Sequence, residues 1–118
     1  MKYVVDTNIA ILAPEDLGLS VLVVAELLFG ARRSVRLEEN VARVRALEAR
    51  FPVLPVDRPI VEHYGIMRAE LAARGLAKSG FDLLIACTAL EHGSILVTND
   101  AALKDGSIPR LVVEDWLS

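Results

Sequence analysis

Short runs of apolar residues alternate along the chain with longer segments in which apolar residues recur every three or four positions. An apolar run without polar alternation is typical of a strand that is buried on both faces of a parallel sheet. The first run, Tyr3-Val4-Val5, leads directly into Asp6. The pattern predicts strands at residues 3–5, 19–21, 53–56, 95–98 and 111–113. Pro55 places the third of these at an edge of the sheet.

The periodic segments predict helices, because a spacing of three and four residues puts apolar side chains on one helical face. We expect helices at 23–33, 36–51 and 81–92, another that Asp57 caps and Gly75 ends, and short helical turns at 8–12 and 101–104. Residues 14–18 predict a turn. Strands that alternate with helices indicate an α/β fold with a central parallel sheet.

The bulk composition favours one domain, residues 1–118, with a dense core and some apolar surface. Hydrophobic residues make up 53% of the chain, and the mean hydropathy is +0.42. Such a surface favours an oligomer or a bound partner. The formal net charge of -3 does not by itself indicate nucleic-acid binding. The lone Cys87 fits a reducing cytosol, and neither a membrane span nor a signal peptide is evident.

Three acids stand at the ends of predicted strands or at the starts of predicted helices. Asp6 follows the first strand, Asp82 opens a helix, and Asp100 follows the strand 95–98. Ligands bind at the carboxyl edge of open α/β sheets, so these acids are candidates for chemistry. Each could equally be a helix cap, and Ser79 with Asp82 resembles a capping box.

Glu26 differs from these acids, because it lies inside a helix and is the only charge between Leu19 and Phe29. That setting predicts a carboxylate that is at least partly buried and therefore needs a partner. An ion pair with an arginine such as Arg33 would satisfy it. A cation shared with the other three acids is favoured, since those acids lie at the sheet edge that Glu26 could reach.

Four converging carboxylates repel one another, and a hard divalent cation relieves that repulsion. Oxygen ligands alone favour Mg²⁺ or Mn²⁺ over zinc. Carboxylates that hold Mg²⁺ with waters are typical of phosphoryl-transfer sites, and no glycine-rich phosphate loop points to a nucleoside triphosphate.

Four motifs together resemble a PIN domain of the VapC toxin type: Val5-Asp6-Thr7-Asn8, Ala25-Glu26-Leu27-Leu28-Phe29-Gly30, Asp82-Leu83-Leu84-Ile85-Ala86 and Val97-Thr98-Asn99-Asp100. The resemblance spans essentially the whole chain. It implies a three-layer α/β/α sandwich and a Mg²⁺- or Mn²⁺-dependent endoribonuclease that is the toxin of a toxin–antitoxin pair.

The family's catalytic and metal-binding acidic quartet carries over onto Asp6, Glu26, Asp82 and Asp100. Asn8, Thr98 and Ser20 would support the site. Two departures are visible: the link from Leu12 to Leu19 is short, and Phe81 stands where relatives often carry a polar residue.

A negative site needs basic residues elsewhere to hold an RNA backbone. Arg32, Arg33 and Arg36 are the candidates, although a solvated helix face that pairs with nearby glutamates explains them equally well. Two rival functions are a metal-dependent phosphatase on a similar frame and a non-catalytic RNA-binding domain. The expected partners are RNA, a small antitoxin and a second copy of the chain, in the cytoplasm.

Overall fold

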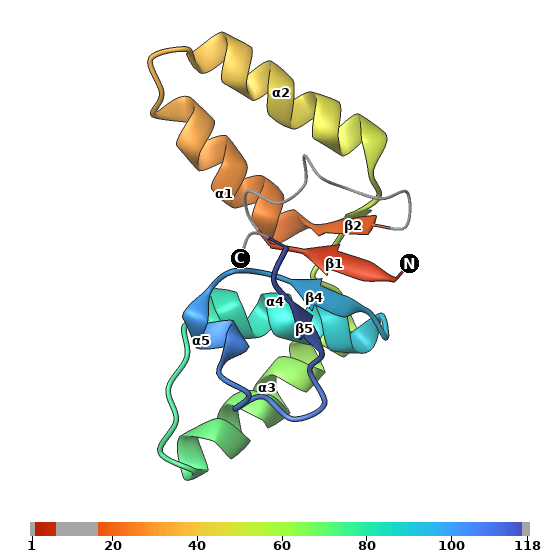
Figure 1. Ribbon diagram of the computed structural model, residues 1–118, viewed down its shortest axis with the longest axis vertical. Coiled ribbons are helices and arrows are strands. Elements are labelled where there is room, and N and C mark those ends of the chain that lie inside the picture. Colours follow the sequence, from red (N-terminus) through yellow and green to blue (C-terminus); the bar gives the residue numbers. More distant parts are fainter. Residues whose placement is uncertain (1, 7–16, 117–118) are drawn as a thin grey trace.

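The computed structural model describes residues 2–6 and 17–116 (Figure 1). Within them, one sheet is ordered β3-β2-β1-β4-β5, and every neighbouring pair is parallel. Its strands are β1 (Tyr3–Val5), β2 (Leu17–Ser20), β3 (Val53–Leu54), β4 (Ile95–Val97) and β5 (Val113–Glu114). The predicted α/β class and central parallel sheet are confirmed, and β3 is an edge strand as Pro55 indicated.

The register of the three inner strands brings their carboxyl ends to one edge. Val5 pairs with Leu19 on one side and with Val97 on the other. The residues that follow this row are Asp6, Ser20 and Thr98. Three of the predicted site residues therefore come from adjacent strands.

Five helices occur in the described ranges: α1 (Val21–Arg32), α2 (Leu37–Arg50), α3 (Arg58–Ala73), α4 (Gly80–Glu91) and α5 (Ala101–Lys104). Side chains of Ser20, Asp57, Ser79 and Asp100 cap the starts of α1, α3, α4 and α5. Gly75 and Gly93 follow α3 and α4 with φ of 70° and 60°, values that favour glycine at a helix end. The predicted helices are confirmed to within two residues at each end.

The strand predictions were less accurate. The second strand begins at Leu17 and ends at Ser20, because Ser20 already caps α1. The predicted turn 14–18 is thus wrong at Leu17 and Gly18, which belong to β2. The predicted helical turn at 8–12 lies outside the described residues. The last strand is Val113–Glu114 rather than 111–113.

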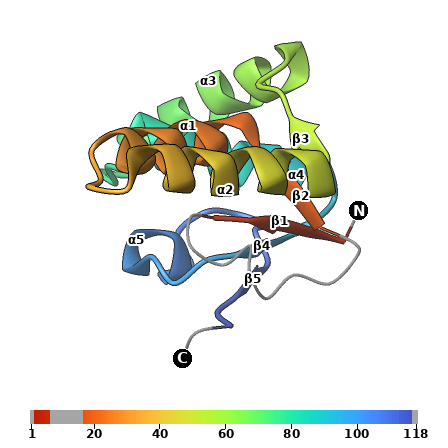
Figure 2. The ribbon, with the colours of Figure 1, turned by 90° about the horizontal axis from the view of Figure 1, so that it is seen from above.

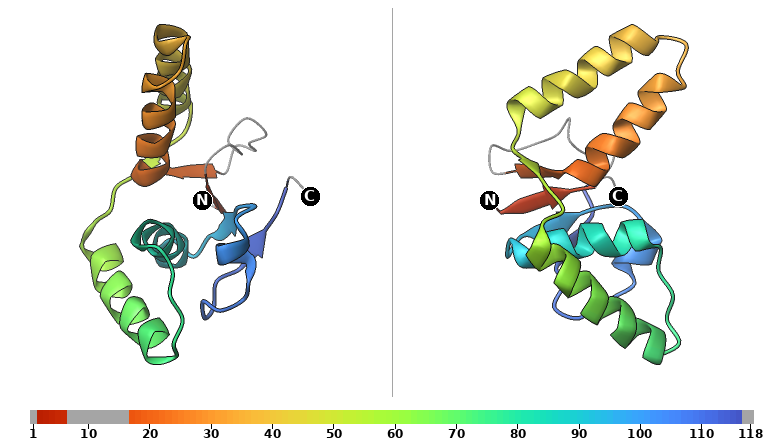
Figure 3. Two further views of the ribbon diagram at one scale, coloured as in Figure 1. Left: turned by 90° about the vertical axis from the view of Figure 1, so that its left-hand side faces the viewer. Right: turned by 180° about the vertical axis from the view of Figure 1, so that it is seen from behind.

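Alternate side chains of the sheet enter two different cores. Val4 and Leu96 pack with α3 and α4, whereas Val5 and Val97 belong to a cluster that includes residues of α1 and α2. Figure 3 shows α3 and α4 beside the sheet and the paired helices α1 and α2 extending from the end where β2 lies. Viewed from above, α1 and α2 run side by side (Figure 2). The carboxyl edge of the sheet lies where α1 and α5 start.

Candidate active site

Thr98 joins two of the predicted acids. Its hydroxyl donates to Asp6 Oδ2 (2.8 Å) and accepts the backbone N–H of Asp100 (3.1 Å). Thr98 is fully buried, so its orientation is fixed by the packing around it. The Asp6 N–H also donates to the Val97 carbonyl (2.9 Å), which ties the end of β1 to the end of β4. Asp6 and Asp100 are therefore held at one edge through a single side chain.

Asp100 caps α5, because its Oδ1 accepts the N–H of Ala102 (2.9 Å). The capping interpretation is thus confirmed for Asp100, and it leaves Oδ2 available for a second role. Ser79 Oγ accepts the N–H of Asp82 (3.1 Å), so Ser79 is the cap of α4 and Asp82 occupies the first turn. Negative charge is favoured in that first turn by the helix dipole.

The charges of Asp100 and Asp6 act on the Asp82 carboxyl. Burial raises the pKa of the Asp82 carboxyl above its usual range, and the charges of Asp100 and Asp6 raise it further. A hydrogen bond with the Ser79 side chain and the charge of Lys78 act in the opposite direction. An α-helix that leads into the next parallel strand runs antiparallel to it, so the start of α4 lies at the carboxyl edge of β4. The three aspartates thus form one electrostatic group.

The prediction that Glu26 is at least partly buried is wrong. Glu26 is exposed on α1, and Phe29 one turn later is 57% exposed. The apolar sequence of α1 belongs to a helix that packs on α2 and the sheet but leaves its outer face open. Glu26 makes no ion pair among the described residues, and Arg33 lies over the Phe29 ring instead. Glu26 is also not among the charges that shift the pKa of Asp82.

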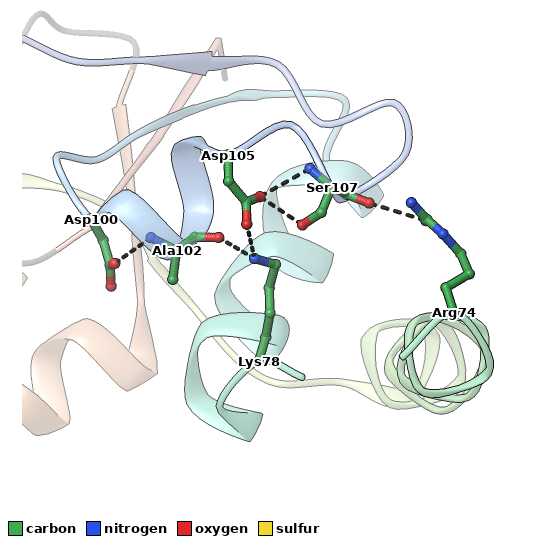
Figure 4. A network of polar contacts seen from close by, with 6 residues as sticks. All are labelled: Arg74, Lys78, Asp100, Ala102, Asp105 and Ser107. Carbon is green, nitrogen blue, oxygen red and sulfur yellow. Dashed lines mark hydrogen bonds and ion pairs between the residues drawn. The ribbon is translucent and has the colours of Figure 1, made fainter. Parts of the chain in front are cut away.

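The supporting residues differ in what they do. Ser20 is fully buried and caps α1 by accepting the N–H of Leu22 (3.1 Å), so it sets the start of the helix that carries Glu26. Asn8 and the link from Leu12 lie outside the described residues. Lys78 was missed, because a lone lysine in a loop carries no motif; its contacts with α5 link two parts of the site (Figure 4).

The predicted arginine cluster lies at the tip of the α1–α2 pair. Arg32 ends α1, Arg33 caps it, and Arg36 precedes α2. At ~1.5 Å per residue, α1 places this tip roughly 18 Å from the start of the helix. Arg36 pairs with Glu39 (3.7 Å), as a solvated helix face would. In the part of the chain that the structure describes, Arg32 and Arg33 have no acidic partner.

The donor set fits a hard divalent cation. Carboxylate and hydroxyl oxygens gather at the sheet edge, and the charges of Asp6 and Asp100 act on Asp82. Within residues 2–6 and 17–116, no three His, Cys, Asp or Glu side chains are grouped closely enough to hold a metal ion. Mg²⁺ is commonly held by one or two carboxylates and several waters, so this looser arrangement is compatible with it.

The PIN domain family matches residues 5–107 of the chain. The tRNA(fMet)-specific endonuclease VapC of Salmonella typhimurium is 32% identical over 98% of both chains. Ribonuclease VapC2 of Rickettsia felis is 31% identical over 98% of both. The chain is a PIN-domain protein of the VapC ribonuclease family.

Solved structures of VapBC complexes confirm the PIN-type fold. DNA-bound VapBC from Salmonella typhimurium superposes with a TM-score of 0.86 at 30% identity, covering 98% of both chains. VapBC2 from Rickettsia felis, bound to a promoter DNA fragment, gives 0.83 at 30% identity, covering 98% of this chain and 99% of that one. PIN-domain nucleases generally require a divalent metal ion. None of the helices in the described ranges is long and apolar enough to cross a membrane.

Proposed function

We propose that this PIN-domain protein is a metal-dependent endoribonuclease that hydrolyses RNA phosphodiester bonds as the toxin of a VapBC-type pair. The observation that carries the proposal is that Thr98 joins Asp6 to Asp100 at the carboxyl edge of the sheet, where α4 begins with Asp82 in its first turn. Relatives named ribonucleases match it over nearly their whole length, which supports the same activity in a single domain of 118 residues.

Asp6, Asp82 and Asp100 are the residues that would hold the ion, and oxygen donors favour Mg²⁺ or Mn²⁺. When bound, such an ion supplies positive charge for the scissile phosphate and lowers the pKa of water. Thr98 orients the Asp6 carboxylate and, through the backbone of Asp100, fixes where β4 leaves the sheet. Glu26 faces solvent on α1, where it would accept the proton of the attacking water or contact the ion through water.

The arginines at the α1–α2 tip would hold the RNA backbone outside the negative site. Arg32 and Arg33 are exposed, and the structure describes no acidic partner for either. An RNA strand can span the length of α1, so phosphates near the tip and at the site can be contacted together. Asn8, which follows Asp6 closely in sequence, is assigned a supporting role at the site.

Partners follow from the same relatives. The similar structures are complexes of VapB with VapC, so we assign this chain a cognate antitoxin. The exposed apolar residues of α1 give that antitoxin a surface to cover, and a homodimer would cover others. We also propose that the protein acts in the cytoplasm, where it would meet both an RNA substrate and a protein antitoxin.

Calorimetry with EDTA and with millimolar Mg²⁺ tests the proposal. Binding to the folded state stabilises by about 2.7 kcal/mol when free ion is 100 times its dissociation constant. Wild type should therefore melt at a higher temperature with Mg²⁺, whereas Asp6→Asn, Asp82→Asn and Asp100→Asn should gain less. All three variants should cleave RNA orders of magnitude more slowly.

The matched control is Asp57→Asn. Asp57 caps α3 through the N–H of Ile60 (3.4 Å) and is not among the charges that act on Asp82, and asparagine caps as well as aspartate. This variant should keep the full response to Mg²⁺ and the full RNA cleavage. A wild type that shows no metal-dependent shift, together with unchanged cleavage by Asp82→Asn, would reject the proposed function.

A further inference from the structure

Lys78 places a nearly buried cation between the loop that precedes α4 and the end of α5. Its side chain is 4% exposed. Lys78 Nζ donates to Asp105 Oδ2 (2.8 Å) and to the backbone carbonyl of Ala102 (Figure 4). One ammonium group therefore connects two segments that lie more than twenty residues apart in the sequence.

The two segments each carry one acid of the candidate site. Asp82 lies four residues after Lys78, in the first turn of α4. Asp100 caps the start of α5, and Lys78 pairs with Asp105, which follows the end of that helix. Lys78 is also among the charges that act on Asp82. The path from Asp82 through Lys78 and α5 to Asp100 is thus short and continuous.

Helix α5 needs such a contact, because it has only four residues. Helices this short are not stable on their own, and their last carbonyls lack partners within the helix. The ammonium satisfies the Ala102 carbonyl and adds a cation at the negative end of the helix. Its carboxylate partner Asp105 is held in turn by Ser107, whose N–H (2.9 Å) and Oγ (2.6 Å) both donate to Asp105 Oδ1.

Lys78 is not the only residue that holds α5 against the rest of the protein. Leu103 is 2% exposed and packs into the main core, and Arg74 donates to the Ser107 carbonyl (3.3 Å) from the end of α3. The ion pair of buried Lys78 with half-exposed Asp105 is in any case weak evidence for stability, since desolvation of the ammonium offsets its attraction. We therefore infer that Lys78 sets the orientation of α5, whereas the other contacts keep the helix attached to the rest of the protein.

We propose that Lys78 is a positioning residue of the nuclease site, which holds α5, and with it Asp100, in place relative to Asp82 in the first turn of α4. This inference rests on the proposed function, and it concerns a residue that touches neither RNA nor the ion. Residues that orient metal ligands typically change metal affinity or activity by about 10- to 100-fold when they are replaced.

The first test is Lys78→Met, which keeps an unbranched stem and removes the ammonium. Isothermal titration with Mn²⁺ should show binding weakened by about 10-fold or more, and kcat for RNA cleavage should fall similarly. The KM for RNA should stay near the wild-type value, since the arginines at the α1–α2 tip are unchanged. The sign is decisive, because removal of a nearby cation would by electrostatics alone strengthen the binding of a divalent ion.

Lys104→Met is the matched control. Lys104 is also on α5 and forms an ion pair with Asp115 (2.5 Å), but that pair does not reach the start of α4. This variant should keep Mn²⁺ binding and RNA cleavage. Combining Lys78→Met with Asp105→Asn should add little to the effect of Lys78→Met alone, because both changes remove the same ion pair.

Amide hydrogen exchange gives a readout that needs no metal. The N–H groups of Leu103 and Lys104 both donate to the Asp100 carbonyl (3.1 Å each). With EDTA present, these amides should exchange faster in Lys78→Met, while amides in the middle of α4 should be unchanged. Faster exchange throughout the protein would mean general destabilisation and would overturn the inference.

The outcomes separate the two proposals. If wild type binds Mn²⁺ and cleaves RNA but Lys78→Met binds the ion equally or more tightly, the inference fails while the proposed function stands. The same holds if Lys104→Met weakens Mn²⁺ binding as much as Lys78→Met does. If wild type neither binds Mn²⁺ nor cleaves RNA, the proposed function fails and the inference fails with it.

Discussion

Thr98 shows how one buried hydroxyl can serve two acids. It donates to Asp6 and accepts from the Asp100 backbone, and both bonds lie at the end of β4. The sequence motif assigned Thr98 a supporting role without saying what it supports. The structure supplies the contact: Thr98 sets the orientation of one carboxylate and the direction in which the chain leaves the sheet.

Thr98→Val should leave the fold intact and impair the site. Valine has nearly the same shape, but it cannot donate to Asp6 or accept from Asp100. We expect RNA cleavage to fall by about 10- to 100-fold, as for other groups that orient ligands. Thr98→Ser keeps the hydroxyl and should restore most of the activity. Equal reductions in both variants, measured by steady-state cleavage of a labelled RNA, would show that packing matters rather than the hydroxyl.

The raised pKa of Asp82 predicts how stability depends on pH. Its folded state holds the proton more tightly than the unfolded chain, whose pKa is near 3.8. This tighter proton binding stabilises the folded state. The stabilisation is fully present below the unfolded pKa and is lost as pH rises through the raised pKa of Asp82. With EDTA, Asp82→Asn should therefore gain stability relative to wild type between about pH 4 and pH 7.

Urea unfolding at about pH 4 and at about pH 7 measures this gain in stability. The lowered pKa of Asp105 acts in the opposite direction, but Asp105 is present in both proteins, so its effect cancels in the comparison. If the difference in unfolding free energy between wild type and variant is the same at both pH values, the pKa of Asp82 is not raised in the folded protein.

At the scale of elements, helix ends were predicted well because local chemistry fixes them. Asp57, Ser79 and the glycines after α3 and α4 act within a few residues of their own position. Strand ends and exposure depend on distant contacts. The apolar sequence around Glu26 carried no sign that α1 packs on α2 along one side only, and so the burial of Glu26 was predicted wrongly.

The sequence suggested four acids for the site, but it held no information on how they are arranged in space. That Thr98 joins Asp6 to Asp100 depends on β4 lying beside β1, an order that no local pattern encodes. The contact between Lys78 and α5 depends on the same order, which explains why sequence reasoning could not find it.

The α1–α2 tip predicts a salt-dependent contact with RNA. Replacing Arg32 and Arg33 with Ala should weaken RNA binding and reduce the slope of log K against log salt concentration by about 0.7 for each phosphate that is no longer neutralised. The control is Arg43→Ala with Arg45→Ala, because these arginines already pair with Glu39 and Glu48 (2.9 Å each). RNA binding is measured at several salt concentrations in an inactive Asp82→Asn background. If both double variants show the same slope, Arg32 and Arg33 do not contact RNA phosphates and the tip is only a solvated surface.

At the scale of the whole molecule, exposed apolar residues occur on two separate surfaces. Phe29 is 57% exposed on α1, in the helix that carries Glu26, and Ile66 is 61% exposed on α3. Ile66 lines a depression of about 770 Å³ between α3 and the segment before β5. Because Phe29 lies one turn after Glu26 on α1, a partner on Phe29 would also lie next to Glu26.

The last prediction tests which of these two surfaces binds the antitoxin. An antitoxin that silences the nuclease should cover the outer face of α1, so Phe29→Ser should keep RNA cleavage but lose binding of the co-expressed antitoxin and its inhibition. Ile66→Ser, an equally exposed residue on α3, should keep antitoxin binding. Light scattering of wild type at micromolar concentration should show a homodimer. If Ile66→Ser loses the antitoxin while Phe29→Ser retains it, the inhibitory surface lies on α3, and inhibition must then act at a distance from the acids.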